Sequence, residues 1–144
     1  MGHSIKPQVC EGCRVPKGWG EELIIENNEM YCGKLLIFKP GCKFSMHYHL
    51  LKDETWYVNT GEFIYRWIDT ENATVNEVNL KPGNVVRQRV GQPHQLEALT
   101  EGVVFEVSTT HFDEDSYRIW KGDGQSNSLL SQISTSNDNE KELF

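Results

Sequence analysis

Three of the five histidines in the chain stand in a pattern that suits metal binding. His47 and His49 are two residues apart in a segment with strand-like composition, so both side chains should project from one face. Glu54 follows after a short break, and His94 opens another expected strand. Three neutral imidazoles and one carboxylate suit a divalent ion of Mn, Fe, Co, Ni or Zn, with positions left for water or substrate. These four residues are candidate ligands, although an H-x-H pair on a strand also occurs without any metal.

The elements that must position these residues are short strands separated by Gly, Pro and Asn turns. Strands at this spacing predict an all-β sandwich or barrel instead of alternating strands and helices. The expected strands are Glu22–Glu26, Tyr31–Lys39, Lys43–His49, Glu54–Thr60, Glu62–Asp69, Thr74–Leu80, Asn84–Val90, His94–Ala98 and Val103–Thr109. We divide the chain into an N-terminal arm at 1–20, a barrel with its C-terminal extension at 21–120, and a polar tail at 121–144. The tail should be flexible, with one short helix around Leu129–Ile133 as the alternative.

Composition excludes several classes of function. The chain has 144 residues, enough for one compact domain, and 14 Lys and Arg against 21 Asp and Glu give a net charge of −7. Such a surface repels a polyphosphate backbone, so we expect no nucleic-acid partner. No apolar run approaches the ~20 residues that span a bilayer, and the N-terminus does not look like a signal peptide. We therefore expect a soluble, cytoplasmic protein with no membrane partner and with reduced cysteines.

The spacing around the histidines resembles the first motif of the cupin superfamily at every defined position: Gly41, His47, His49, Glu54 and Gly61. The second cupin motif is met at Gly83, Gly91 and His94, but Arg89 and Ala98 replace its proline and asparagine. The resemblance covers about residues 31–110. It implies an antiparallel jelly-roll β-barrel in which His47, His49, Glu54 and His94 converge as the metal ligands.

Three further segments resemble cupins that act on sugars. Lys17–Glu22 is similar to the segment that opens the cupin domain of mannose-6-phosphate isomerases, and Phe105–Thr109 with Asp115–Arg118 is similar to the segment that closes it. Lys52 lies in an H-x-H-x-x-K-x-E arrangement that resembles D-lyxose-isomerase-type cupins. The resemblance implies a metal-dependent isomerase or epimerase of a sugar or sugar phosphate.

An aldose–ketose isomerisation needs a group that moves a proton between adjacent carbons. Lys52 is the first candidate, provided that burial lowers its pKa, and a solvated loop lysine is the alternative. Glu106 is the second, or else a structural partner of Lys34 or Arg118, and Tyr65 is the third. For the substrate we name Arg66, Arg87, Arg89 and Trp56, with pairing to surface acids as the alternative for the arginines. His111 should lie at the surface or rim.

Two other functions remain open. A site of three histidines and one glutamate also describes a non-haem iron dioxygenase of the cupin type. A non-catalytic carbohydrate-binding cupin, with a structural metal, is the third hypothesis. The N-terminal arm needs a surface to lie on, and similar cupins often exchange such arms, so we expect a homodimer through the N-terminal strands.

Overall fold

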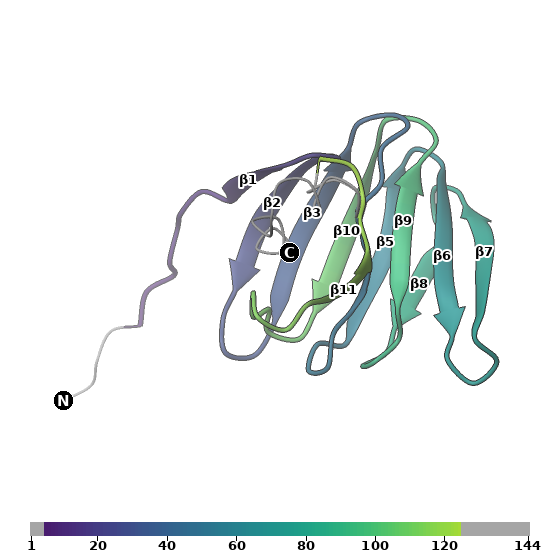
Figure 1. Cartoon of the computed structure of the whole chain (residues 1–144). Coiled ribbons are helices and arrows are strands. Elements are labelled where there is room, and N and C mark those ends of the chain that lie inside the picture. Colours follow the sequence, from purple (N-terminus) through teal and green to yellow (C-terminus); the bar gives the residue numbers. More distant parts are fainter. Residues whose placement is uncertain (1–4, 125–144) are drawn as a thin grey trace, which may run out of the picture.

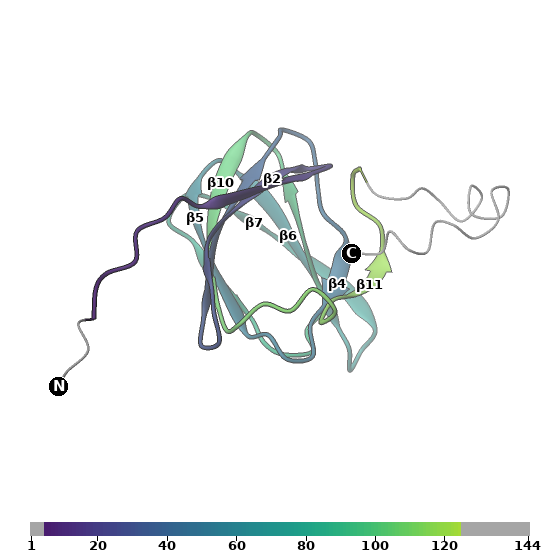
Figure 2. The ribbon, with the colours of Figure 1, turned by 90° about the vertical axis from the view of Figure 1, so that its left-hand side faces the viewer.

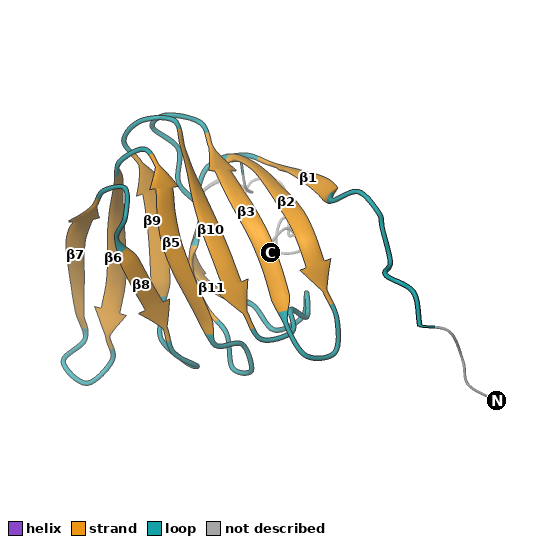
Figure 3. Cartoon of the chain, turned by 180° about the vertical axis from the view of Figure 1, so that it is seen from behind, coloured by secondary structure: helices purple, strands orange, loops and turns teal. Residues whose placement is uncertain are grey.

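The computed structural model describes residues 5–124 as two antiparallel β-sheets that face each other (Figures 1 and 2). The larger sheet has the order β1 (Cys13–Lys17), β2 (Gly20–Asn27), β3 (Cys32–Phe38), β10 (Gly102–Ser108), β5 (Glu54–Thr60) and β8 (Val85–Gln88). The smaller has the order β11 (Tyr117–Trp120), β4 (Met46–Tyr48), β9 (His94–Ala98), β6 (Phe63–Asp69) and β7 (Thr74–Leu80). This is the expected jelly-roll architecture. Residues 5–124 contain no helix long and apolar enough to cross a membrane (Figure 3).

All nine expected strands occur, and β5, β7 and β9 have the expected bounds. The strand expected over Lys43–His49 is shorter, because only Met46–Tyr48 pairs continuously and Lys43 makes an isolated bridge to Glu97. Two strands were not expected. β1 lies within the segment assigned to the arm and β11 within the C-terminal extension, whereas the helix considered around Leu129–Ile133 falls outside the described residues.

The interior is apolar at one end of the central strands and charged at the other. Facing inward, β3 and β10 each carry a buried apolar residue next to a buried charged one, Leu36 beside Lys34 and Val104 beside Glu106. On β5, buried Val58 and Trp56 precede buried Glu54 in the same direction. The apolar end is closed by a core that includes Phe38, Phe63 and Leu96. Burial of the apolar end stabilises the fold. The other end carries the charged side chains.

The turn between β1 and β2 fixes an aromatic side chain in this core. Trp19 is 4% exposed and stacks on Phe38 at 4.5 Å between ring centroids. Gly20 follows with φ +151°, and a Cβ there would overlap the carbonyl oxygen of Ile37. Only glycine can both adopt this backbone conformation and approach β3 so closely.

We predict that Gly20→Ala lowers the free energy of unfolding by at least about 2 kcal/mol, since strain and a backbone clash combine. The matched control is Gly41→Ala. Gly41 also has a positive φ, +79°, but a Cβ at this position would meet no atom within 4 Å, so only about 1 kcal/mol should be lost. Urea unfolding measures both, and equal losses would contradict the clash.

Candidate metal centre

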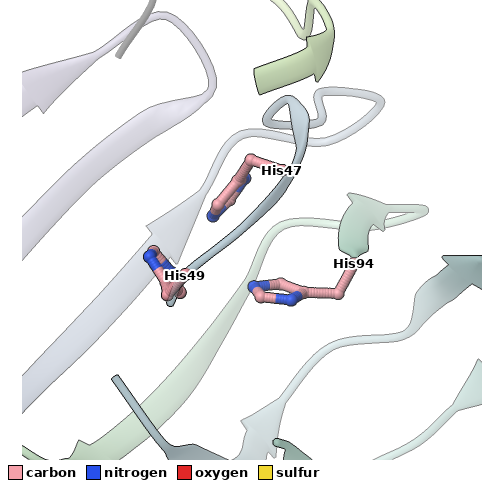
Figure 4. Close-up of side chains that lie close together, drawn as sticks. All are labelled: His47, His49 and His94. Atoms are coloured by element: carbon pink, nitrogen blue, oxygen red, sulfur yellow. The ribbon is translucent and has the colours of Figure 1, made fainter. Parts of the chain in front are cut away.

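Three imidazoles meet at the polar end of the barrel. His47 on β4 pairs across the sheet with His94 on β9, and His49 follows directly after β4. Figure 4 shows the three rings grouped together between the strands. One ring nitrogen from each lies within 4.8 Å of those of the other two, so these nitrogens are close enough to share one ion.

Backbone carbonyls set the tautomer of each ring. The Nδ1 atoms of His47, His49 and His94 lie 2.8, 2.6 and 2.8 Å from the carbonyl oxygens of Ser45, Asp115 and Gln92. A carbonyl oxygen only accepts, so each Nδ1 carries the hydrogen and each neutral ring keeps its lone pair on Nε2. Burial, with His94 and His49 nearby, holds the pKa of His47 well below its ordinary value. His47 is therefore neutral and able to ligate.

Glu54 adds a carboxylate to this group. It is 2% exposed, and its Oε2 lies 3.2 Å from Nε2 of His49 and 3.1 Å from Nε2 of His94. Burial favours a higher pKa, but the positive charge of Lys52 outweighs it and holds the pKa of Glu54 well below its ordinary value. Trp56 fixes the other oxygen, because its indole N–H donates to Oε1 at 3.1 Å.

The residues present fit a divalent cation. Within residues 5–124, neither Oε2 of Glu54 nor Nε2 of His94 has a hydrogen-bond partner, although both atoms are buried and face each other. Two adjacent lone pairs without a hydrogen between them leave a buried polar cost that a cation would remove. Two ligand atoms at right angles around an ion, each at about 2.1 Å, would stand about 3.0 Å apart, close to the separation seen.

Lys52 lies next to this group and is held by acids. Its Nζ is 2.7 Å from Glu106 Oε2 and 3.9 Å from Glu54 Oε1, and it is 3% exposed. Burial would lower the pKa of Lys52, but the charges of Glu106 and Glu54 outweigh it and raise the pKa. The condition under which Lys52 would transfer protons, a pKa lowered by burial, is therefore not met, because the two carboxylates compensate for desolvation. Lys52 is a positive hydrogen-bond donor.

His111 takes part in the same contacts. Lys52 donates to its Nδ1 at 3.2 Å, and its Nε2–H donates to Asp113 at 3.0 Å. Burial and the charges of Lys34 and Lys52 lower the pKa of His111 to about 4, so the ring is neutral near pH 7. His111 lines the cavity at its rim, where it orients the lysine.

Asp115 is the residue that sequence reasoning missed. Its carboxylate accepts the backbone N–H groups of Leu50, Leu51 and Lys52 at 2.7 to 3.2 Å, while its carbonyl accepts Nδ1–H of His49. One residue, 4% exposed, thus fixes both the loop that carries Lys52 and one imidazole. Asp115 belongs to the closing segment named above, but no local signal gives it this role, because its partners are more than sixty positions away in sequence.

Most of these residues line a cavity of about 500 Å³, although His94 and Asp115 are not among its lining residues. Its apolar walls include Trp19, Trp56 and Phe44. Its polar lining includes Glu106 and the pair of buried Lys34 and partly exposed Glu22, whose charged atoms are 3.2 Å apart. Trp56, named above for the substrate, is in place to contact one. The cavity combines aromatic faces with paired charges beside the imidazoles.

Four other candidates do not line this cavity. Tyr65 is packed in the core against Trp56 and Trp67, and burial raises its pKa to about 12. The three arginines lie elsewhere. Arg66 on β6 pairs with Glu77 and Glu97, Arg87 on β8 pairs with Asp53, and Arg89, just after β8, is exposed. The structure therefore does not bring the three arginines to this cavity, where we had expected them to contact the substrate. Pairing with surface acids, the alternative considered, describes Arg66 and Arg87.

We predict that Asp115→Asn lowers the free energy of unfolding by about 1–3 kcal/mol, because an amide has one acceptor oxygen where three N–H groups need partners. Asp113→Asn is the control, since that side chain is 97% exposed and should change stability by less than about 0.5 kcal/mol. Chemical unfolding of both variants tests this. Equal small effects in the two variants would contradict the proposal that the Asp115 carboxylate holds the loop before β5 in place.

Comparison with known proteins identifies the type of fold. No family model and no curated protein sequence matches the chain. Among solved structures, the capsular polysaccharide assembling protein CapF from Staphylococcus aureus is 21% identical with a TM-score of 0.68, over 76% of this chain and 32% of CapF. Oxalate decarboxylase from Bacillus subtilis is 15% identical with a TM-score of 0.65, over 90% of this chain and 36% of that one. An RmlC-like cupin from Shewanella frigidimarina is 16% identical with a TM-score of 0.55, over 65% and 78%.

The chain thus spans about a third of the length of CapF and of oxalate decarboxylase. At these identities the likeness concerns architecture, and it agrees with the spacing of the two histidine motifs. The chain has the cupin fold.

Proposed function

We propose that this protein is a metal-dependent cupin enzyme that isomerises or epimerises a sugar or sugar phosphate. The observation that carries the proposal is the buried pair of Lys52 and Glu106, 2.7 Å apart, beside four candidate metal ligands, three of which line the same cavity. His47, His49, Glu54 and His94 would hold one divalent ion of Mn, Fe, Co, Ni or Zn. When bound, that ion would supply Lewis-acid stabilisation of negative charge on a substrate oxygen.

The two buried side chains have complementary roles in this proposal. In an isomerisation, Glu106 is the carboxylate that accepts the proton from the carbon next to the carbonyl and returns it to the carbonyl carbon. The proton of the adjacent hydroxyl group passes to the former carbonyl oxygen in the same reaction. Lys52, kept positive by its two acidic neighbours, donates a hydrogen bond to the oxygen on which negative charge develops. His111 and Glu106 hold the ammonium group from two directions, so little reorganisation is needed during reaction. Tyr65 has no part in this scheme.

The cavity lining favours an uncharged sugar over its phosphate. No arginine lines the cavity, and its buried lysines, Lys34 and Lys52, are both paired with glutamates. A phosphate that reached either buried lysine would have to displace one of these carboxylates, whereas hydroxyl groups can share them. The third lysine in the lining, Lys17, is partly exposed and lies on β1. Trp19 and Trp56 offer aromatic faces to the apolar side of a sugar ring.

The ligand set itself supports one second candidate, a non-haem iron dioxygenase, since three histidines and a glutamate leave positions for oxygen. Consumption of oxygen during turnover would identify it, and turnover without oxygen supports the isomerase. Ligand binding that survives removal of the metal would instead support a non-catalytic binding protein.

We also propose that the protein works as a cytoplasmic homodimer. Its four cysteines are free thiols, which a reducing compartment would preserve. Residues 5–12 are exposed throughout and extend away from the sheets (Figure 2). Ile5 and Val9 are 94% and 92% exposed, and a partner subunit would cover them.

We predict that His94→Ala loses the bound metal and melts at a lower temperature, because an ion held only by the folded state adds to its stability. His111→Ala is the matched control: it removes another imidazole from the same cavity but no proposed ligand, so metal content should stay near one ion per chain. Elemental analysis of the purified variants measures this. Full occupancy in His94→Ala would refute the ligand assignment.

We predict that Lys52→Met reduces turnover by roughly 10²-fold or more while metal content and fold are kept, since methionine preserves the stem but not the charge. A screen of pentoses, hexoses and their phosphates supplies the substrate, and uptake of solvent deuterium next to the carbonyl gives the readout. Lys39→Met, at an exposed position, is the control and should behave as wild type. If Lys52→Met turns over normally, the lysine is structural.

A further inference from the structure

A second ion pair, formed by Lys34 and Glu22, lines the cavity away from the candidate metal ligands. Lys34 on β3 is 3% exposed, and its Nζ lies 3.2 Å from Oε1 of Glu22 on β2. In the larger sheet, β5, which carries Glu54, is followed by β10, β3 and β2 (Figure 1). At about 4.8 Å per strand, the backbone of Lys34 stands roughly 10 Å across the sheet from β5. The pair has no role in the metal centre described above.

The strand register explains why Lys34 pairs toward β2. Its partner across the strands is Glu106 on β10, and both side chains are buried in the interior. Glu106, however, pairs with Lys52 at 2.7 Å, and Lys34 reaches the carboxylate of Glu22 instead. The cavity therefore contains two separate ion pairs, one beside the candidate metal ligands and one beyond them.

The outer pair has unused hydrogen-bonding capacity. An ammonium group has three N–H donors, but within residues 5–124 Nζ of Lys34 makes one hydrogen bond, to Oε1 of Glu22. Oε2 of Glu22 accepts no hydrogen bond from the same part of the chain. Because both residues line the cavity, two donors and one carboxylate oxygen remain for a ligand there.

The fold itself does not need a charged pair at this position. Taking two charges out of water is costly, and apolar residues of similar volume are often as stabilising as a buried ion pair. Ile24, opposite Lys34 on β2, and Leu36, two positions along β3, line the same cavity as apolar residues. A lysine and a glutamate kept among such neighbours favour the binding of a polar ligand.

We propose that Lys34 and Glu22 form a subsite for two hydroxyl groups on adjacent carbons of the substrate, remote from the carbons that react. A lysine N–H donates to one hydroxyl oxygen, and the other hydroxyl donates to Oε2 of Glu22. A donor beside an acceptor selects sugars by the presence and configuration of these two hydroxyls. The inference rests on the proposed function in taking the ligand to be a sugar, and it names the residues that choose among sugars.

The methyl pyranosides of D-glucose, D-mannose and D-galactose test the subsite. They present adjacent hydroxyls in different configurations, but they cannot open to the carbonyl form that an isomerase uses. Titration calorimetry measures the dissociation constant of each. For the glycoside that binds most tightly, two monodeoxy analogues that lack hydroxyls on adjacent carbons should each bind at least about tenfold more weakly, since hydrogen bonds to charged groups are lost.

Lys34→Met combined with Glu22→Leu should remove this discrimination. The double variant should melt no lower than the wild type and should bind the parent glycoside and both analogues equally within twofold. Arg14→Met with Glu21→Leu is the matched control, because this ion pair, 2.8 Å apart in the same sheet, lines no part of the cavity and should keep the tenfold discrimination. If the double variant does not fold, Glu22→Gln should reduce one of the two losses to about threefold, because a neutral acceptor binds a hydroxyl more weakly.

The results separate the subsite from the reaction. Glycosides that bind with this pattern to a protein that turns over no sugar would overturn the isomerase but support the subsite. Discrimination that persists without Lys34 and Glu22 would make the pair structural and overturn the subsite. Failure of all three glycosides to bind the wild-type protein would also overturn it.

Discussion

The polar end of this barrel depends on three hydrogen bonds from imidazole Nδ1–H groups to backbone carbonyls. A buried histidine can bind a cation only as a neutral ring with a free nitrogen, and a hydrogen bond to a carbonyl decides which nitrogen that is. Because the acceptors belong to the main chain, the tautomers of His47, His49 and His94 are set by the fold before any ion arrives. The carboxylate of Glu54 then faces lone pairs instead of donors.

Lys52 also depends on partners that the fold places around it. Burying an ammonium group is costly unless carboxylates and acceptors surround it, and Lys52 has Glu106, Glu54 and His111. Asp115 fixes the backbone of the loop that bears Lys52, and its carbonyl also orients His49. Asp115 therefore positions both one candidate metal ligand and the backbone of the lysine.

Sequence alone could predict the parts of this structure that depend on local patterns. Alternation and turn residues gave the bounds of β5, β7 and β9, and motif spacing brought together His47, His49, Glu54 and His94. β1 was missed because Pro16 and its polar neighbours look like a linker, although proline is compatible with an edge strand. Asp115 and the position of Arg87 depend on contacts between segments distant in sequence, which no local pattern records.

Nitrogen-15 NMR of the histidine side chains observes the ring nitrogens on which the metal centre depends. We expect His47, His49 and His94 to be protonated at Nδ1 in the metal-free protein. One equivalent of Zn²⁺ should then shift the Nε2 resonance of all three together while that of His111 stays in place. Rings protonated at Nε2, or Nε2 resonances that do not respond to Zn²⁺, would contradict a metal centre whose tautomers are set by the backbone.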